Sequence, residues 1–353
     1  MHGMKSFLTF ALAAIFGNLS AQEKTLHFEG KIGPGKGKHI VLVSGDEEYR
    51  SEETMPMLAK ILAIKHGFDC TVLFSWSKDR KYIDPNNSAG VIGWDKLDSA
   101  DLIIVGTRMR KIADERDRAH MTKYLNAGKP VIGYRTSTHA FIGNEKFGTI
   151  SLNDWGLRIV GERWVNHHGQ HKGEGARGII EKGQEKHPVL NSVSDIFAPS
   201  DVYGVRNLTE KDTVLLRGQV TKTLAPDSPP TEGKKNDPMM ALAWLHTYTA
   251  PNGEATGTSL CTTAGASVDF LSEDLRRLVV NGTYHLLGLK VPAEADVNYI
   301  DPFYPSFYGF WSGENAKIWE KRALVAEDFS LGKVPETHDP KGTPKWPHRP
   351  ERK

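Results

Sequence analysis

The sequence has very little cysteine: Cys70 and Cys261 are the only two in its 353 residues. A dense disulfide framework is therefore excluded as the source of stability, which has to come mainly from a hydrophobic core. A single bridge between the two thiols would be open to an exported protein. Each cysteine lies inside an apolar run, so we expect two buried small side chains rather than a bridge.

The sequence also lacks an excess of charge, since 45 lysines and arginines are balanced by 43 aspartates and glutamates. It contains no basic cluster, which argues against a nucleic-acid partner. Hydrophobic residues make up 39% of the chain. That is enough for one large α/β domain, or for one domain with elaborations.

Several familiar catalytic motifs are absent. The sequence has no Gly-x-Ser-x-Gly elbow, no Walker loop and no His-Glu-x-x-His zinc motif. No Gly-x-Gly-x-x-Gly follows the first predicted strand. The glycine-rich run at 33–37 precedes that strand, so it is predicted to be a turn or linker rather than a phosphate-binding loop.

Only the N-terminus carries the features of a targeting segment. Lys5 is followed by an apolar stretch over residues 7–17 and by a plausible cleavage site at residues 18–21. We predict a signal peptide over residues 1–21 and a periplasmic or secreted protein that makes no membrane contact after cleavage. An uncleaved anchor is the alternative, because Leu19 is larger than the residue usually found before a cut.

Apolar runs alternate with helical spacings in the first part of the chain. The predicted strands cover residues 38–44, 69–75, 101–106 and 130–134, and the predicted helices cover residues 52–66 and 114–127. Ser51 is a candidate N-cap for the first helix, and Gly67 a candidate stop. This alternation predicts an α/β fold with a flavodoxin-like, mostly parallel, doubly wound sheet.

The pattern changes after residue 148. Residues 149–240 predict a β-rich elaboration, with short strands at 176–181, 202–205 and 213–219. Strands at 241–247 and 256–263 and an amphipathic helix at 269–288 return to the parent sheet, so one domain is predicted over residues 38–290. Residues 291–353 predict a loop-rich tail that wraps the domain, with flexible last residues.

The strand predicted at 130–134 runs directly into Arg135, and we expect a helix to follow. Ligands of open α/β sheets bind just outside the carboxyl ends of the strands. Elbow enzymes place a nucleophile at this turn, whereas an arginine can bind an anion or polarise an oxygen but cannot attack. We therefore predict Arg135 and His139 as catalytic residues, with His139 as proton shuttle because the free imidazole pKa lies near neutrality.

The ends of the other predicted strands supply further polar side chains. The predicted substrate-binding residues among them are Asp46, Glu47, Tyr49, Arg108, Thr136 and Thr263. Arginine offers a planar fork of donors that suits carboxylate, phosphate or sugar oxygens. A structural interpretation competes at residues 46–48, because carboxylates at the start of a helix are stabilised by its dipole. Arg108 and Arg110 would then only pair with these carboxylates.

A histidine-rich segment follows Trp164 and contains His167, His168 and His171. Three imidazoles within five residues are able to hold a divalent metal. The i, i+4 pair of His167 and His171 would need a helix, which Gly169 and its neighbouring glycines disfavour. We predict a loop lining the site, with His168 as catalytic and His167 as substrate-binding residue and no metal. Metal binding by the three histidines remains the alternative.

The order and spacing of these segments resemble the trehalose-utilisation (ThuA-like) family, whose fold is similar to class I glutamine amidotransferases. The resemblance covers residues 38–290 and rests on the segments 40–46, 100–105, 128–133, 167–168, 187–190, 201–203 and 263–265 and on the helix ending at Gly288. Amidotransferases carry a catalytic cysteine at the elbow that Arg135 occupies here, so the resemblance excludes glutamine hydrolysis by a thiolate. The family is tied to disaccharide catabolism, with links to 3-keto sugars, which implies a carbohydrate substrate.

These observations predict an exported protein of carbohydrate catabolism that acts on a disaccharide or keto-sugar through acid–base chemistry, as a hydrolase, lyase or isomerase. Two alternatives stay open: a non-catalytic domain that binds a carbohydrate or another partner, and a metal-dependent hydrolase built on the histidine segment. A small-molecule carbohydrate is the expected partner, and no cofactor is predicted. The sequence does not determine the oligomeric state.

Overall fold

The computed structural model describes residues 24–311, 315, 317–339, 341–346 and 350. The predicted signal peptide at residues 1–21 lies outside the described residues. Within the described part of the chain, no helix is long and apolar enough to cross a membrane.

The centre of the molecule is a ten-stranded sheet with the strand order β1-β3-β2-β4-β5-β12-β11-β10-β8-β9. The strands of this sheet are β1 (Thr25–Phe28), β2 (His39–Gly45), β3 (Asp69–Leu73), β4 (Leu102–Thr107), β5 (Val131–Tyr134), β8 (Ala176–Ile180), β9 (Ile196–Ala198), β10 (Thr213–Val220), β11 (Met240–Thr249) and β12 (Thr256–Thr262). A separate two-stranded sheet pairs β6 (Lys146–Phe147) with β7 (Ile150–Ser151).

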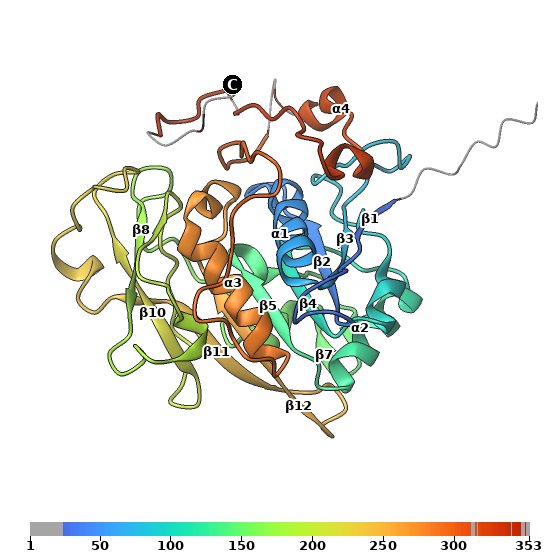
Figure 1. Ribbon diagram of the computed structural model, residues 1–353, viewed down its shortest axis with the longest axis horizontal. Coiled ribbons are helices and arrows are strands. Elements are labelled where there is room, and N and C mark those ends of the chain that lie inside the picture. Colours follow the sequence, from blue (N-terminus) through green and yellow to red (C-terminus); the bar gives the residue numbers. More distant parts are fainter. Residues whose placement is uncertain (1–23, 312–314, 316, 340, 347–349, 351–353) are drawn as a thin grey trace, which may run out of the picture.

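The sheet has a parallel half with antiparallel strands on either side of it, since β1 pairs antiparallel with β3. Strands β3, β2, β4, β5 and β12 are parallel neighbours, whereas β11, β10, β8 and β9 continue the sheet in antiparallel pairs. In Figure 1 the antiparallel strands extend to the left of the parallel ones. The α/β class with a large mixed sheet is confirmed, and the segment between β5 and β12 extends the parallel strands with antiparallel ones.

Helices cover both faces of the parallel half. The helices are α1 (Ser51–His66), α2 (Glu115–Asn126), α3 (Glu273–Leu286) and α4 (Ile318–Arg322). Helices α1 and α3 lie side by side on one face (Figure 1) and share one hydrophobic cluster with Leu42 and Ile104. Helix α2 packs on the other face, where its buried residues share a second cluster with the alternate strand residues Val41 and Ile103.

The boundaries of α1 and α2 follow from their end residues. Gly67 ends α1 in a left-handed conformation with φ 78°, as expected for a helix stop. The predicted N-cap is displaced by one residue: Arg50 caps α1, and Ser51 is its first helical residue. The hydroxyl of Ser51 instead accepts a hydrogen bond from the backbone of Gly45, so it ties α1 to the end of β2. Asp114 caps α2 by accepting from the backbone of Arg116.

Three sequence predictions of local structure are corrected. Residues 202–205 form no strand and contribute only an isolated bridge between Tyr203 and His167. The helix predicted from 269 begins at Glu273, since residues 267–271 form a 3₁₀ helix, η7 (Ser267–Leu271). The segment after β5 is likewise a 3₁₀ turn, η2 (Arg135–His139), rather than a helix.

Cys70 and Cys261 are both buried and free, as the sequence predicted. They lie on β3 and β12, which are separated in the sheet by three other strands. The two thiols therefore fill space in the core.

The division of the chain into a domain, an elaboration and a tail stays a prediction.

The chain after α3 folds back across the ends of α1. Ser306 donates from its backbone and its hydroxyl to Glu53 in the first turn of α1. The backbone of Gly309 donates to the carbonyl of Glu48, and Arg50 donates to the carbonyl of Gly309. These contacts bring the tail to the carboxyl end of β2.

Candidate functional site

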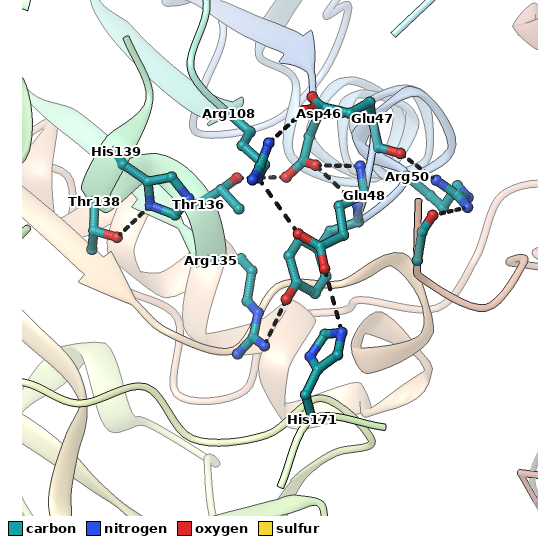
Figure 2. Close-up of polar contacts among 12 residues, drawn as sticks. Asp46, Glu47, Glu48, Arg50, Arg108, Arg135, Thr136, Thr138, His139 and His171 are labelled. Carbon is teal, nitrogen blue, oxygen red and sulfur yellow. Dashed lines mark hydrogen bonds and ion pairs between the residues drawn. The ribbon is translucent and has the colours of Figure 1, made fainter. Parts of the chain in front are cut away.

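The carboxyl ends of the parallel strands gather polar side chains at one edge of the sheet. Because β2, β4, β5 and β12 are parallel, the loops that follow them lie at the same edge. The loop after β2 carries residues 46–50, β4 is followed by Arg108, β5 by η2, and β12 by Thr263. Figure 2 shows how the first three of these loops turn their side chains toward one another. The structure thus brings together the predicted side chains of these loops, Asp46 with Thr136 and Glu47 with Arg108.

Asp46 organises the loop after β2. Its buried carboxylate accepts hydrogen bonds from the backbones of Glu48 and Tyr49, at 2.8 and 2.9 Å, and from the hydroxyl of Thr136. Burial, together with the nearby charge of Glu47, raises the pKa of Asp46 to about 6. Since its oxygens are all engaged inside the protein, Asp46 and Thr136 hold the two loops in register.

Glu47 pairs with two arginines. Its carboxylate lies 2.5 Å from Nη1 of Arg108 and 2.5 Å from Nη2 of Arg110. Arg110 is buried, whereas Glu47 and Arg108 keep 16% and 20% of their side chains exposed. The pairing that was the alternative for these residues is therefore present, and it directs the Arg108 guanidinium at Glu47 while a fifth of the side chain stays exposed.

Glu48 lies between the guanidinium of Arg108 and the imidazole of His171. Its Oε2 is 3.5 Å from Nε of Arg108, and its Oε1 is 3.4 Å from Nε2 of His171 (Figure 2). The side chain is buried to all but 7%. Glu48 is not among the site residues predicted from the sequence, and nothing in its local sequence indicates the contact with His171.

Arg135 stands at the elbow after β5 but is fully buried. Its backbone adopts a left-handed conformation with φ 48°, which is uncommon outside glycine and is found at strained functional turns. Nη1 donates to the carbonyls of Asp201 and Thr263, and Nη2 donates to the Asp201 carboxylate at 2.9 Å and to the hydroxyl of Tyr49. The guanidinium also stacks on Tyr203, 3.8 Å from its ring centre.

In this environment Arg135 holds neighbouring protein groups in position. Its two terminal nitrogens are occupied by protein groups, and 0% of the side chain is exposed. Tyr49 and Thr263 serve the same buried arrangement, through their hydroxyl and carbonyl oxygens. The structure therefore places Arg135 beneath the exposed part of the site, in contact with Asp201.

Asp201 joins two histidines of the predicted histidine segment. Its Oδ2 lies 2.7 Å from Nδ1 of His167, and its Oδ1 lies 3.2 Å from Nδ1 of His171. The two imidazole rings are 4.4 Å apart between their centres. Asp201 is fully buried, while His167 and His171 keep 31% and 28% of their side chains exposed.

The charges around Asp201 shift two pKa values. Burial alone would raise the pKa of Asp201, but the Arg135 charge and the hydrogen bonds from His167 and His171 hold it well below its usual range. Burial alone would lower the pKa of His171, but its hydrogen bonds to Asp201 and Glu48 outweigh burial and raise it. The cluster thus combines an ionised buried carboxylate with imidazoles that reach solvent.

His139 lies apart from this cluster. Its Nδ1 contacts the hydroxyl of Thr138 at 3.2 Å (Figure 2), and its ring lies 5.8 Å from that of Trp164. Burial, followed by the charges of Arg108 and Arg135, lowers the pKa of His139 to about 3. The pKa of His139 thus lies well below that of the free imidazole, and the ring is uncharged at neutral pH.

His168 is directed to the other side of its loop. Its Nε2 lies 2.8 Å from the carbonyl of Lys235, and its backbone donates to the carbonyl of Val202. The loop is not helical, as its glycines predicted, yet it brings His167 and His171 to the same carboxylate. Of the three histidines, His168 is the one that the structure keeps away from Asp201.

Two exposed aromatic side chains border the cluster. Trp164 is 39% exposed and lies 5.9 Å from the His167 ring, centre to centre. Phe310 of the tail is 49% exposed, and its ring lies 4.8 Å from the guanidinium carbon of Arg108. Neither was singled out as a site residue from the sequence. In the local sequence, the only signal for Trp164 is that it is an aromatic residue next to a run of histidines.

No family model and no curated protein matches the chain. Solved structures of low identity are similar to it. A ThuA-like protein from Bacteroides uniformis is 13% identical, with a TM-score of 0.44, over 72% of this chain and 92% of that one. A ThuA-like protein from Parabacteroides merdae is 14% identical, with a TM-score of 0.46, over 73% and 92%. A cytoplasmic protein from Salmonella typhimurium is 12% identical, with a TM-score of 0.36, over 70% and 98%. Two of these similar structures thus bear the name of the family that the sequence motifs resemble.

Proposed function

We propose that the chain is an exported ThuA-like enzyme of carbohydrate utilisation, which acts on a disaccharide or keto-sugar at the carboxyl ends of the parallel strands. The five parallel strands follow the order 2-1-3-4-5 along the chain. This is the strand order of flavodoxin-like sheets, whose ligands bind at that edge. It supports the finer fold assignment and the location of the site.

The observation that carries the proposal is the position of His171 between the carboxylates of Asp201 and Glu48. Both carboxylates are buried, whereas the imidazole ring reaches solvent. Buried charges are costly unless they are paired, so such groups at a ligand-binding edge are a typical arrangement of a functional site.

The arrangement suits removal of a proton from a carbon next to a keto group. The Glu48 carboxylate would accept the proton, and the electron pair of the C–H bond would move onto the carbonyl oxygen as an enolate forms. A positive partner at His167 and His171 would stabilise the developing oxyanion. Return of the proton at a different carbon gives isomerisation, and loss of a leaving group from the enolate gives elimination.

The surroundings of the cluster fit a sugar. Arg108 is a fifth exposed, and an arginine fork has donors suited to hydroxyl or carbonyl oxygens beyond those that its carboxylate partners occupy. The exposed rings of Trp164 and Phe310 offer apolar faces of the kind on which the C–H side of a sugar ring packs. Polar donors flanked by exposed aromatics are the chemistry that would recognise a carbohydrate.

The test is a proton NMR time course of the purified protein with trehalose and with a 3-keto disaccharide. We expect new anomeric or ring signals with the keto-sugar, and their loss by at least about 100-fold in Glu48→Gln, because general-base removal costs 10²–10⁴-fold. Glu210→Gln, at an exposed position, is the control and keeps the activity. Broadened substrate lines without product would instead support a non-catalytic binding domain, and no change with either sugar would refute the carbohydrate assignment.

A further inference from the structure

We propose that His167, His171 and Asp201 bind one divalent transition-metal ion. The inference concerns the site of the proposed function, but it does not depend on the identity of the sugar. It names the positive partner that the enolate oxygen would need. Within the described residues, these three side chains are the ones whose ligand atoms lie close enough together to hold an ion.

The ligand atoms are already gathered at coordination spacing. One nitrogen of each imidazole and one carboxylate oxygen lie within 4.8 Å of one another. Zinc binds nitrogen and carboxylate oxygen at roughly 2.0–2.2 Å, so tetrahedral ligands are about 3.3 Å apart. The separations of 2.7 and 3.2 Å between the Asp201 oxygens and the two Nδ1 atoms need only a small outward adjustment to admit an ion.

Two neighbouring groups fix the orientation of the ligands. Nε2 of His171 faces the Glu48 carboxylate, which only accepts hydrogen bonds, so Nε2 keeps its proton there and Nδ1 is directed at Asp201. When an ion binds, Nδ1 releases to solvent the proton that it donates to Asp201 and offers its lone pair to the ion. A carboxylate behind a metal-binding histidine is the usual outer partner of such sites. Arg135 holds Oδ1 of Asp201 from below at 2.9 Å, while Oδ2 faces His167.

The donor set indicates the class of metal. Two imidazole nitrogens and one carboxylate oxygen suit zinc, iron(II), cobalt or manganese. Magnesium and calcium prefer oxygen ligands throughout. Since His167 and His171 remain about 30% exposed, solvent or a substrate oxygen can reach the remaining coordination positions. Three protein ligands with an open position are typical of catalytic rather than structural zinc sites.

The first experiment is calorimetric titration of Zn²⁺, Mn²⁺ and Mg²⁺ alone into the untagged, chelator-stripped full chain. We expect one Zn²⁺ per chain and no comparable binding of Mg²⁺. His167→Ala should weaken the affinity by more than about 100-fold, and Glu48→Gln by about 10- to 100-fold. His168→Ala is the matched control, because this imidazole contacts Lys235 and should leave the affinity unchanged.

A second measurement needs no variant, so it holds even if His167→Ala fails to fold. Imidazole nitrogen resonances of the wild-type chain should shift for His167 and His171 on addition of Zn²⁺, and those of His168 should not. Absence of stoichiometric binding, or equal losses in His167→Ala and His168→Ala, would overturn the proposal. Metal binding without sugar turnover would refute only the proposed function, and turnover that persists in the metal-free chain without Zn²⁺ binding would refute only the metal site.

Discussion

At the scale of single residues, Arg135 shows how an arginine at the carboxyl end of a buried strand supports other side chains. Its guanidinium neutralises the buried carboxylate of Asp201 and contacts two backbone carbonyls. An arginine is suited to this because it stays charged and presents several donors in a fixed plane. We infer that Arg135 sets the position of Asp201, and through it the position of both histidines.

Arg135→Ala is therefore expected to destabilise the fold by about 3–5 kcal/mol, because Asp201 would be left buried without its charge partner. The measurement is the free energy of unfolding from urea denaturation at pH 7. Arg116→Ala is the control: that arginine pairs with Asp114 at the surface, with 88% of its side chain exposed, and its loss should change little. Equal stability of the two variants would contradict the role assigned to Arg135.

The lowered pKa of His139 predicts how the free energy of unfolding depends on pH. Its pKa is lowered to about 3 in the folded chain, whereas an unfolded histidine titrates near 6.5. The unfolded state therefore binds the proton first, and the stability that is fully present above pH 6.5 is lost as the pH falls toward 3. His139→Asn should reduce the loss of unfolding free energy between pH 6.5 and 5 by about 2 kcal/mol.

The measurement is a series of urea denaturation curves over that pH range for the wild type and the variant. His27→Asn serves as control, because His27 lies at the surface with about half of its side chain exposed. This control should keep the wild-type slope. A slope in His139→Asn that equals the wild-type slope would show that His139 is not held uncharged.

At the scale of elements, the site depends on the turns that connect helices to strands, such as the turn between α2 and β5. Helix α2 ends before Gly128, which has φ 63° and leads the chain into β5. A Cβ at Gly128 would lie 2.5 Å from the carbonyl oxygen of Thr256 at the start of β12. The turn thus positions β5, and with it Arg135, against the neighbouring strand.

Gly128→Ala should be more destabilising than Gly253→Ala. Both glycines have a left-handed backbone, so each variant pays about 1–2 kcal/mol for the conformation. A Cβ at Gly253 meets no atom within 4 Å, whereas the one at Gly128 meets backbone. The difference in unfolding free energy between the two variants measures this contact, and equal values would argue against a rigid α2–β5 turn.

The regular elements were largely predictable, and the irregular ones were not. Strands β2, β4 and β5 begin and end within one residue of the predicted runs, because buried parallel strands are nearly continuous apolar segments. The expected strand at 202–205 is instead a stretch of extended chain with one bridge. Its apolar residues are buried by tertiary contacts rather than by pairing in the sheet.

At the scale of the whole molecule, the two cysteines test the packing of the sheet. Burial raises the pKa of the Cys261 thiol to about 12 and that of Cys70 well above its usual value. A thiol that is buried and protonated reacts slowly. We expect no labelling by a thiol reagent in the native protein and two equivalents in denaturant, counted by mass spectrometry. Fewer than two equivalents in denaturant would indicate a disulfide.

The chain by itself determined the elements and the edge of the sheet where polar side chains collect. Apolar runs, helix stops and the parallel alternation are local signals, and they led to Arg135 and to the histidine segment. Only the tertiary structure decided which of these side chains meet. Asp201 lies 30 residues or more from its histidines in sequence, and Glu48 reaches His171 from another loop. Such pairings depend on loop conformation and burial, which no local pattern encodes, so the fold placed Arg135 below the site and put His167, His171 and Asp201 at its centre.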